Sequence, residues 1–258
     1  LHYPLRRQRQ MCIRDRFNHR PNSLNAGSLW GRPFYILREA WNILNAIAEG
    51  KIESGDEKKL NALKGETMAV IALCQFDLTR CFGYPYTKDN GASLGAPLID
   101  HLVGTYENPS RSTVAQAYDF IIETLEEAVT LMSEEKNNGR MNKYAARALL
   151  ARVYLYHNDN RKAFDMAEQL IKDVDASGSY ALYPHEKYVA AWSVETKFGS
   201  ESFFEIANSV DDTPGRDSWG YLLNWYGYQK GFVTQKYAEQ MLADPGDCLL
   251  YTSDAADE

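Results

Sequence analysis

The segment from residue 142 to residue 174 constrains the fold most, because its apolar residues follow the period of two successive helices. The first predicted helix runs from Asn142 to Tyr156 and the second from Arg161 to Val174. An Asn-Asp-Asn run at 158–160 supplies a turn between them. In the second helix, three- and four-residue steps predict an inward face made by Ala163, Phe164, Ala167, Leu170 and Ile171. A chain with this segment is expected to contain a helical hairpin.

Small residues recur in this hairpin as they do in a tetratricopeptide repeat, a unit of roughly 34 residues. Ala151 is followed by Tyr154, then by Ala163 twelve residues after Ala151, and by Ala167 four residues later. The small residues let two helices approach closely, and Tyr154 is expected to fill the space between them. The match is partial, since Arg147 stands where the repeat has Trp and Ala167 where it has a large aromatic residue.

Two more helices are predicted before the hairpin. Residues 30–48 carry apolar side chains at helical spacing, and Pro33 suits the first turn of such a helix. Asp56 suits the N-cap of a second helix that reaches about Phe82. Because this second helix is apolar on both sides, we expect it to be buried between neighbours.

A loop and a strongly periodic helix are expected next. Residues 83–112 contain Pro85, Pro97 and Pro109 together with several Gly, and loops of this length are usually functional or disordered. Thr113 and Gln116 then form a capping box before a helix that runs to about Met132. The polar face of that helix predicts solvated carboxylates and not a catalytic pair; it consists of Asp119, Glu123, Glu126 and Glu127.

The helical period is lost after residue 175. We therefore divide the body into a helical repeat region at 17–175 and an irregular, loop-rich part of the same domain at 176–247. Within the second part, Glu201–Asn208 is the only plausible strand, and Gln235–Ala243 is a last short helix. The fold class expected from these patterns is mainly all-α.

The two ends of the chain do not read as parts of a fold. Residues 1–16 hold five Arg with no helical or strand period, and residues 248–258 follow abruptly on Pro245-Gly246-Asp247. Both ends resemble translated adapter sequence, so we expect both native termini to be missing and exclude the ends from fold reasoning.

Aromatic residues supply the candidate binding site. Aromatic residues make up 12% of the chain, more than its helical core needs, and five Trp or Tyr residues fall between Arg216 and Phe232. Sugar binding uses flat rings that stack on the C–H faces of pyranoses and planar polar groups that bond hydroxyls. The ring candidates are Trp219, Tyr221, Trp225, Tyr226 and Tyr228, and the hydroxyl partners are Arg216, Asp217 and Asn224. Alternatively, these rings pack the irregular region onto the helices.

Other aromatic residues fit packing better than ligand contact. Trp192 lies between Ala191 and Ser193 and is expected in the core. Tyr84 and Tyr86 could face a ligand from the long loop, but their Tyr-Pro-Tyr run is more typical of a locked turn.

Composition and motifs exclude several function classes. A formal charge of −7 argues against nucleic acid, because phosphate backbones bind basic surfaces. Neither the His nor the Cys residues have metal-ligand spacing, and no catalytic or cofactor-binding motif occurs, so no metal, no cofactor and no enzymatic activity are expected. Cys74 and Cys81 are expected to be small buried residues. No carboxylate pair lies in the apolar, aromatic setting that glycoside hydrolysis uses.

The order of these features resembles the SusD/RagB family over about residues 30–247. The resemblance is carried by residues 66–85, by STVAQAYDFIIETLEEA at 112–128 and by RALLARVYLYHNDNRKAFDMAEQLI at 147–171, with ESFFEIAN as the family's short strand. Cys81 departs from the family, which more often has a bulkier residue there, and the N-terminal lipobox and C-terminal half are absent.

The resemblance implies a function. Members of this family are lipoproteins of the outer-membrane surface that capture oligosaccharides and cover a SusC-type TonB-dependent transporter, while partner enzymes cleave the sugar. By resemblance, this chain would bind glycans without catalysis, next to such a transporter, and would be held by an N-terminal lipid anchor that is missing here.

Two alternatives remain open at this point. One is a tetratricopeptide-type scaffold that binds a peptide or protein partner; its grooves favour Asn, Lys and Arg along inner helices, whereas sugar binding needs clustered rings. The other is a fragment of an all-helical glycoside hydrolase, which would release a hydrolysis product from polysaccharide.

Overall fold

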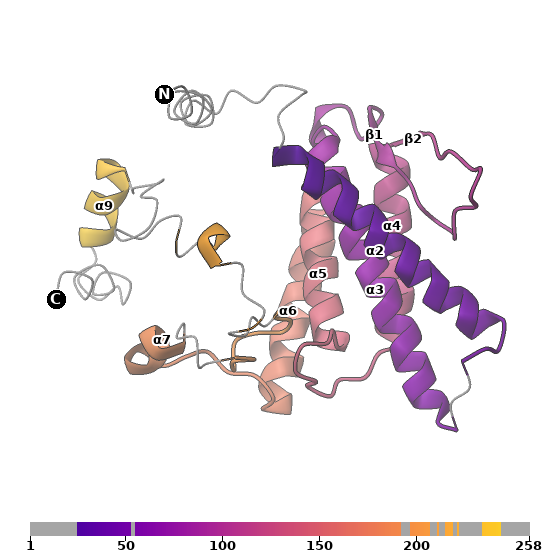
Figure 1. Ribbon diagram of the computed structural model, residues 1–258. Coiled ribbons are helices and arrows are strands. Elements are labelled where there is room, and N and C mark those ends of the chain that lie inside the picture. Colours follow the sequence, from indigo (N-terminus) through magenta and orange to yellow (C-terminus); the bar gives the residue numbers. More distant parts are fainter. Residues whose placement is uncertain are drawn as a thin grey trace, which may run out of the picture. The chain divides into compact units, whose positions relative to one another are not determined.

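The computed structural model describes residues 25–52, 55–191, 197–206, 211, 215–218, 221 and 234–243. Most of these residues are helical, as expected for an all-α fold (Figure 1). The chain divides into two compact units: the first comprises Leu1–Met132 and Leu149–Met166, and the second comprises Ser133–Ala148 and Ala167–Glu258.

The first unit begins with a long helix, α2 (Asn25–Ala48), which ends before Gly50 at a positive φ of 67°. A helix was predicted here, but the position of Pro33 was predicted wrongly. The helix starts earlier than Trp30, so Pro33 lies inside it and not in its first turn. Its missing N–H therefore removes one hydrogen bond from the helix interior.

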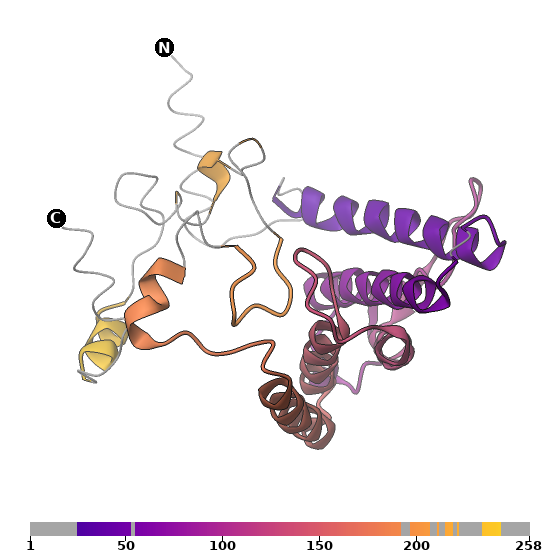
Figure 2. The same cartoon turned by 90° about the horizontal axis from the view of Figure 1, so that it is seen from below.

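Helix α3 (Glu57–Phe82) is the central element of this unit. The predicted N-cap is confirmed, because the Asp56 carboxylate accepts hydrogen bonds from Lys58 N at 3.0 Å and from Lys59 N at 3.3 Å. α3 packs against both α2 and α4 (Val114–Leu131), and Figure 2 shows α2 and α3 side by side. Its two-sided apolar pattern thus reflects burial between two helices.

Helix α4 begins with the predicted capping box. Thr113 Oγ1 accepts a hydrogen bond from Gln116 N at 3.1 Å, and Gln116 Oε1 accepts one from Thr113 N at 2.9 Å. The four acidic residues of its polar face are exposed, as predicted. Two of them also have partners: Glu126 accepts from the buried Tyr154 hydroxyl at 2.5 Å, and Glu127 pairs with Lys64 at 3.0 Å.

The long loop before α4 contains more structure than the sequence predicts. A short 3-10 helix, η1 (Tyr86–Lys88), is followed by two antiparallel strands, β1 (Leu94–Pro97) and β2 (Arg111–Thr113). Gly91 sits between η1 and β1 at a φ of 73°, and a Cβ there would lie 2.7 Å from Ala115 N. The loop is therefore folded back tightly against the start of α4.

One buried cluster of the first unit lies between α2, α3 and the segment that begins with the small sheet. It is built from buried apolar residues, namely Leu37, Ala40, Ile71, Cys74, Leu78, Ala96 and Ile99. Cys81 is exposed, so the prediction that both cysteines are buried is wrong for this one. Cys81 lies one residue before the end of α3, next to Phe82, which packs against Trp30 of α2.

The predicted hairpin consists of α5 (Lys143–Tyr156) and α6 (Asn160–Ser177), joined by a short turn with Asn158 at a φ of 70°. The inward face predicted for α6 is only partly correct. Leu170 and Ala163 are buried, but Phe164 is 59% exposed and Ile171 is 61% exposed. Phe164 and Ile171 each follow a buried residue by one position, about 100° around the helix, so they point away from the buried side.

The second unit contains α7 (His185–Ala191), η2 (Gly215–Asp217) and α9 (Gln235–Leu242) besides its parts of α5 and α6. Its buried cluster joins Tyr144, Leu170, Val174 and Tyr180. The strand predicted at Glu201–Asn208 is wrong over 201–206, which form turns and bends. The other two residues of that prediction lie outside the described part of the chain.

Candidate functional site

The predicted sugar site falls largely outside the described residues. Among its members, Arg216 lies exposed in η2, and Tyr221 is half-buried a few residues later. A short turn joins them, because Ser218 N donates to Gly215 O at 3.2 Å and Tyr221 N donates to the Ser218 hydroxyl at 3.1 Å. These two bonds link Gly215, Ser218 and Tyr221 and leave the relative placement of the Arg216 and Tyr221 side chains open.

The remaining predicted site residues lie outside the part of the chain that the structure describes. They are Trp219, Asn224, Trp225, Tyr226 and Tyr228. The expected core residue Trp192 also lies outside the described residues. The backbone of Asp217 belongs to η2. The site at 216–228 therefore stays a prediction, with Arg216 and Tyr221 as its described members.

Tyr86 and Tyr84 differ in role. The Tyr86 ring packs against Tyr118, with ring centroids 5.7 Å apart, and against His157 at 4.2 Å. These contacts pack the Tyr86 ring against α4 and against the residue that follows α5. Tyr84 is 56% exposed, and the Lys88 ammonium lies over its ring at 3.0 Å from the centroid. The exposed face of Tyr84 is therefore engaged by a cation.

Sequence reasoning missed the most exposed ring of the described residues. Tyr106 lies in the loop between β1 and β2 and is 95% exposed. The available signal was a single aromatic residue close to Gly104, Asn108 and Pro109, which are residues typical of turns. Tyr106 is a second candidate for stacking against a sugar ring.

An apolar cavity of about 310 Å³ lies between α2 and the same loop. Trp30 and Phe34 of α2 line one side of the cavity. The Trp30 ring packs edge-on against Phe34 and Phe82, with ring centroids 5.1 Å and 4.7 Å apart. The loop side is entirely apolar and consists of Pro97, Ile99, Val103 and Pro109. The cavity offers apolar contact without hydrogen-bonding groups, so it fits one face of a ligand better than a whole sugar.

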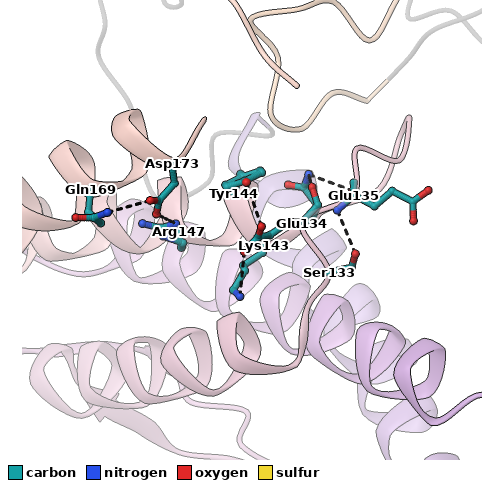
Figure 3. A network of polar contacts seen from close by, with 9 residues as sticks. Ser133, Glu134, Glu135, Lys143, Tyr144, Arg147, Gln169 and Asp173 are labelled. Carbon is teal, nitrogen blue, oxygen red and sulfur yellow. Dashed lines mark hydrogen bonds and ion pairs between the residues drawn. The ribbon is translucent and has the colours of Figure 1, made fainter. Parts of the chain in front are cut away.

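The second unit holds a polar network whose role is structural (Figure 3). Arg147 on α5 donates to Asp173 on α6 at 2.6 Å, and Gln169 donates to the other oxygen of Asp173 at 2.9 Å. The Arg147 bond lowers the pKa of the Asp173 carboxyl. Nearby, Glu134 accepts bonds from Lys143 and Tyr144, both at 3.3 Å. The Glu134 bonds join the segment before α5 to α5, and the Arg147–Asp173 bond joins α5 to α6.

Buried hydrogen bonds extend this network to Tyr180. Asn142 caps α5 by accepting from Ala145 N at 3.0 Å, and its amide donates to the Tyr180 hydroxyl at 2.7 Å. The Lys136 ammonium lies 4.7 Å from the Tyr180 ring centroid. These bonds join the segment before α5, α5 itself and Tyr180 within the second unit.

The described residues show no group of three His, Cys, Asp or Glu side chains that could hold a metal ion. In the same part of the chain, no helix has both the length and the apolar character to cross a bilayer.

The comparisons with known proteins agree on one family. Residues 8–155, more than half of the chain, match the SusD-like family described as "Starch-binding associating with outer membrane". The crystal structure of a SusD superfamily protein from Bacteroides vulgatus ATCC 8482 matches with 94% identity and a TM-score of 0.87, covering 91% of this chain and 53% of that protein. No curated protein matches the chain.

Two further solved structures extend this result. A second protein from Bacteroides vulgatus ATCC 8482 is 37% identical, with a TM-score of 0.82, and the match covers 90% of this chain and 52% of that one. A laminarin-binding SusD-like protein is 24% identical, with a TM-score of 0.56, over 75% of this chain and 40% of that one, which shows a shared fold. The chain thus spans about half the length of the first two relatives.

Proposed function

Because the chain belongs to the SusD-like family, we propose that it serves in the capture of oligosaccharides at the cell surface, without cleaving them. The family match carries this proposal, since the family is described by starch binding and by association with the outer membrane. The laminarin-binding protein adds that a protein of this fold can hold a glucan. An α- or β-linked glucan is therefore the first ligand to test.

Aromatic residues carry the capture in this proposal. Tyr221 and Arg216, which one short turn joins, contribute a ring and a guanidinium. The rings of Trp219, Trp225, Tyr226 and Tyr228 stack on pyranose faces, and Asn224 bonds vicinal hydroxyls. Each stacked ring excludes water from an apolar sugar face, while the planar polar groups fix the orientation of the sugar.

Membership of the same family supports two further parts of the proposal, which concern delivery and location. The protein hands the bound oligosaccharide to a SusC-type TonB-dependent transporter, and an N-terminal lipid anchor holds it on the outer-membrane surface. The proposal that the protein does not cleave the sugar rests on the family membership. The exposed carboxylates of α4, of which Glu126 accepts a hydrogen bond from Tyr154, fit solvated side chains better than a catalytic pair.

Calorimetric titration of the full-length protein with malto- and laminari-oligosaccharides tests the site. We expect Trp219→Ala combined with Trp225→Ala to weaken affinity at least about tenfold, because an aromatic ring contact contributes on the order of 1 kcal/mol. Tyr35→Ala is the matched control, since it removes a 61% exposed ring of α2 outside both candidate sites.

Tyr106→Ala separates the two candidate ring sites. Loss of affinity on removing Tyr106, with no effect of the two Trp substitutions, would move the site to the loop between β1 and β2. Unchanged affinity in all of these variants would contradict both assignments.

A further inference from the structure

The loop between β1 and β2 is fixed at both ends. At its start, the Trp41 indole N–H donates to Ile99 O at 3.2 Å, and Ile99 N donates to the buried Gln75 side chain at 3.3 Å. At its end, Arg111 Nε donates to Gly95 O at 2.6 Å. Between these ends, Val103 packs against the core of the first unit, whereas residues 104–108 are exposed, so their conformation depends largely on contacts made within the loop.

One side-chain cluster supplies such contacts. His101 lies between two carboxylates: its Nδ1 is 2.6 Å from Asp100 Oδ1, and its Nε2 is 2.7 Å from Glu107 Oε1. The other oxygen of Glu107 accepts a hydrogen bond from Gly104 N at 3.1 Å, and Glu107 N donates to Gly104 O at 3.1 Å. His101 and Glu107 thus join the two sides of the loop.

The geometry specifies the protonation state of His101. An ionised carboxylate only accepts hydrogen bonds, whereas a neutral imidazole has one donor and one acceptor nitrogen. With a carboxylate oxygen at each ring nitrogen, a neutral ring would direct one lone pair at a carboxylate. Only the imidazolium satisfies both contacts.

The electrostatic surroundings agree with this assignment. The hydrogen bond to Asp100, followed by that to Glu107, raises the pKa of His101. The Gly104 amide, followed by His101, lowers the pKa of Glu107. Among the described residues, Asp100 and Glu107 are the charged groups that act on His101. The nearby cation Arg111 donates its hydrogen bonds to the Gly95 and Leu94 carbonyls.

We propose that His101 and Glu107 form a pH-dependent latch, closed when His101 is protonated, that sets the conformation of the loop carrying Tyr106 and one wall of the apolar cavity. When the latch opens, residues 100–107 lose their cross-loop contact while Ile99 and Arg111 stay fixed. Val103 and Pro109 line the cavity and Tyr106 faces solvent, so opening changes both the cavity wall and the presentation of the ring.

The latch has a defined direction with pH. The pKa of His101 is raised in the folded chain. The latch therefore stabilises the closed loop fully at pH values below the ordinary pKa of His, about 6.5, and this stabilisation is lost as pH rises through the pKa of the folded chain. It is lost again in acid, when Glu107 becomes protonated. The loop is thus most ordered in mildly acidic solution.

Two measurements on the intact chain test the latch without any glycan. The first is an NMR titration of the His101 ring, in which we expect a pKa above about 6.5 that falls in Glu107→Gln. The second is amide hydrogen exchange of residues 102–107, corrected for the intrinsic effect of pH. We expect exchange about fivefold faster above the His101 pKa than below it, and no such pH step in His101→Gln.

Asp175→Asn is the matched control, since it removes an exposed carboxylate of α6 that belongs to the second unit. It should leave both the His101 titration and the exchange step unchanged. A His101 pKa near its ordinary value in both wild type and Glu107→Gln would overturn the proposal, and so would a pH step that persists in His101→Gln.

Discussion

Gly65 of α3 lies so close to α4 that a Cβ at this position would come within 2.9 Å of the Ala128 carbonyl oxygen. The same Cβ would lie 2.7 Å from Met132 Cγ. Because the nearer obstacles include backbone, the helices would have to separate to admit a methyl group. The close packing of α3 and α4 thus depends on a residue without a side chain.

Gly65→Ala should lower the free energy of unfolding by about 1–3 kcal/mol, although Ala is the better helix former by roughly 1 kcal/mol. Urea unfolding measures this change. Gly31→Ala is the control, because nothing lies within 4 Å of a Cβ at that position in α2, and it should be neutral or slightly stabilising. Equal stabilities of the two variants would show that the α3–α4 packing is looser than described.

Cys74 and Cys81 should differ sharply in reactivity. Burial raises the pKa of the Cys74 thiol to about 11, while Cys81 is exposed at the end of α3. The thiolate is the reactive form, so at about pH 7.5 an alkylating reagent should label Cys81 and spare Cys74 until the chain unfolds. Peptide mass mapping reads out both sites, and Cys81→Ser should abolish the labelling of this helix. Rapid labelling of Cys74 in the native chain would refute its burial.

Asp173 should contribute to acid sensitivity. Its pKa is lowered chiefly by the hydrogen bond from Arg147, so the folded state is stabilised at pH values above the ordinary pKa of Asp, about 3.9. This stabilisation is lost as pH falls through the lower, folded value. The difference in unfolding free energy between wild type and Asp173→Asn should therefore shrink in acid.

Asp165→Asn is the comparison for that prediction, because the Arg161–Asp165 pair on the same helix is far more exposed. It should change stability little at any pH, since exposed ion pairs contribute little. A constant difference between Asp173→Asn and wild type from neutral pH to about pH 3 would rule out the assigned role of Asp173.

The long helices of the first unit were predictable because local signals agree there. Asp56 and Thr113 are capping residues placed directly before periodic apolar runs, and both cap α-helices in the structure. Capping and periodicity act over a few residues, so they can be read without knowledge of the rest of the fold.

Strands were less predictable, because a strand exists only with a partner. β1 contains Gly95 and Pro97 and β2 is three residues long, so neither has strand character alone; they pair across the loop. Residues 201–206 have the aromatic and apolar residues that favour strands, yet they form turns and bends. Pairing is a tertiary property, and short-range pattern does not reveal it.

The orientation of α6 illustrates a similar limit. The sequence shows that Phe164 and Ile171 are apolar, but not which neighbour covers which side of the helix, and both are exposed here. The candidate binding residues likewise include some that the sequence reveals and some that only the fold reveals. Clustering of rings at 216–232 could be read from sequence, whereas the exposure of Tyr106 and the His101 contacts required the fold of the loop.

Binding of an intact oligosaccharide to the full-length protein tests the central proposal most directly. We predict a saturable calorimetric titration with at least one malto- or laminari-oligosaccharide, and recovery of that oligosaccharide unshortened by chromatography after prolonged incubation. Absence of binding across the panel, or shortened products from the purified protein, would contradict non-catalytic glycan capture.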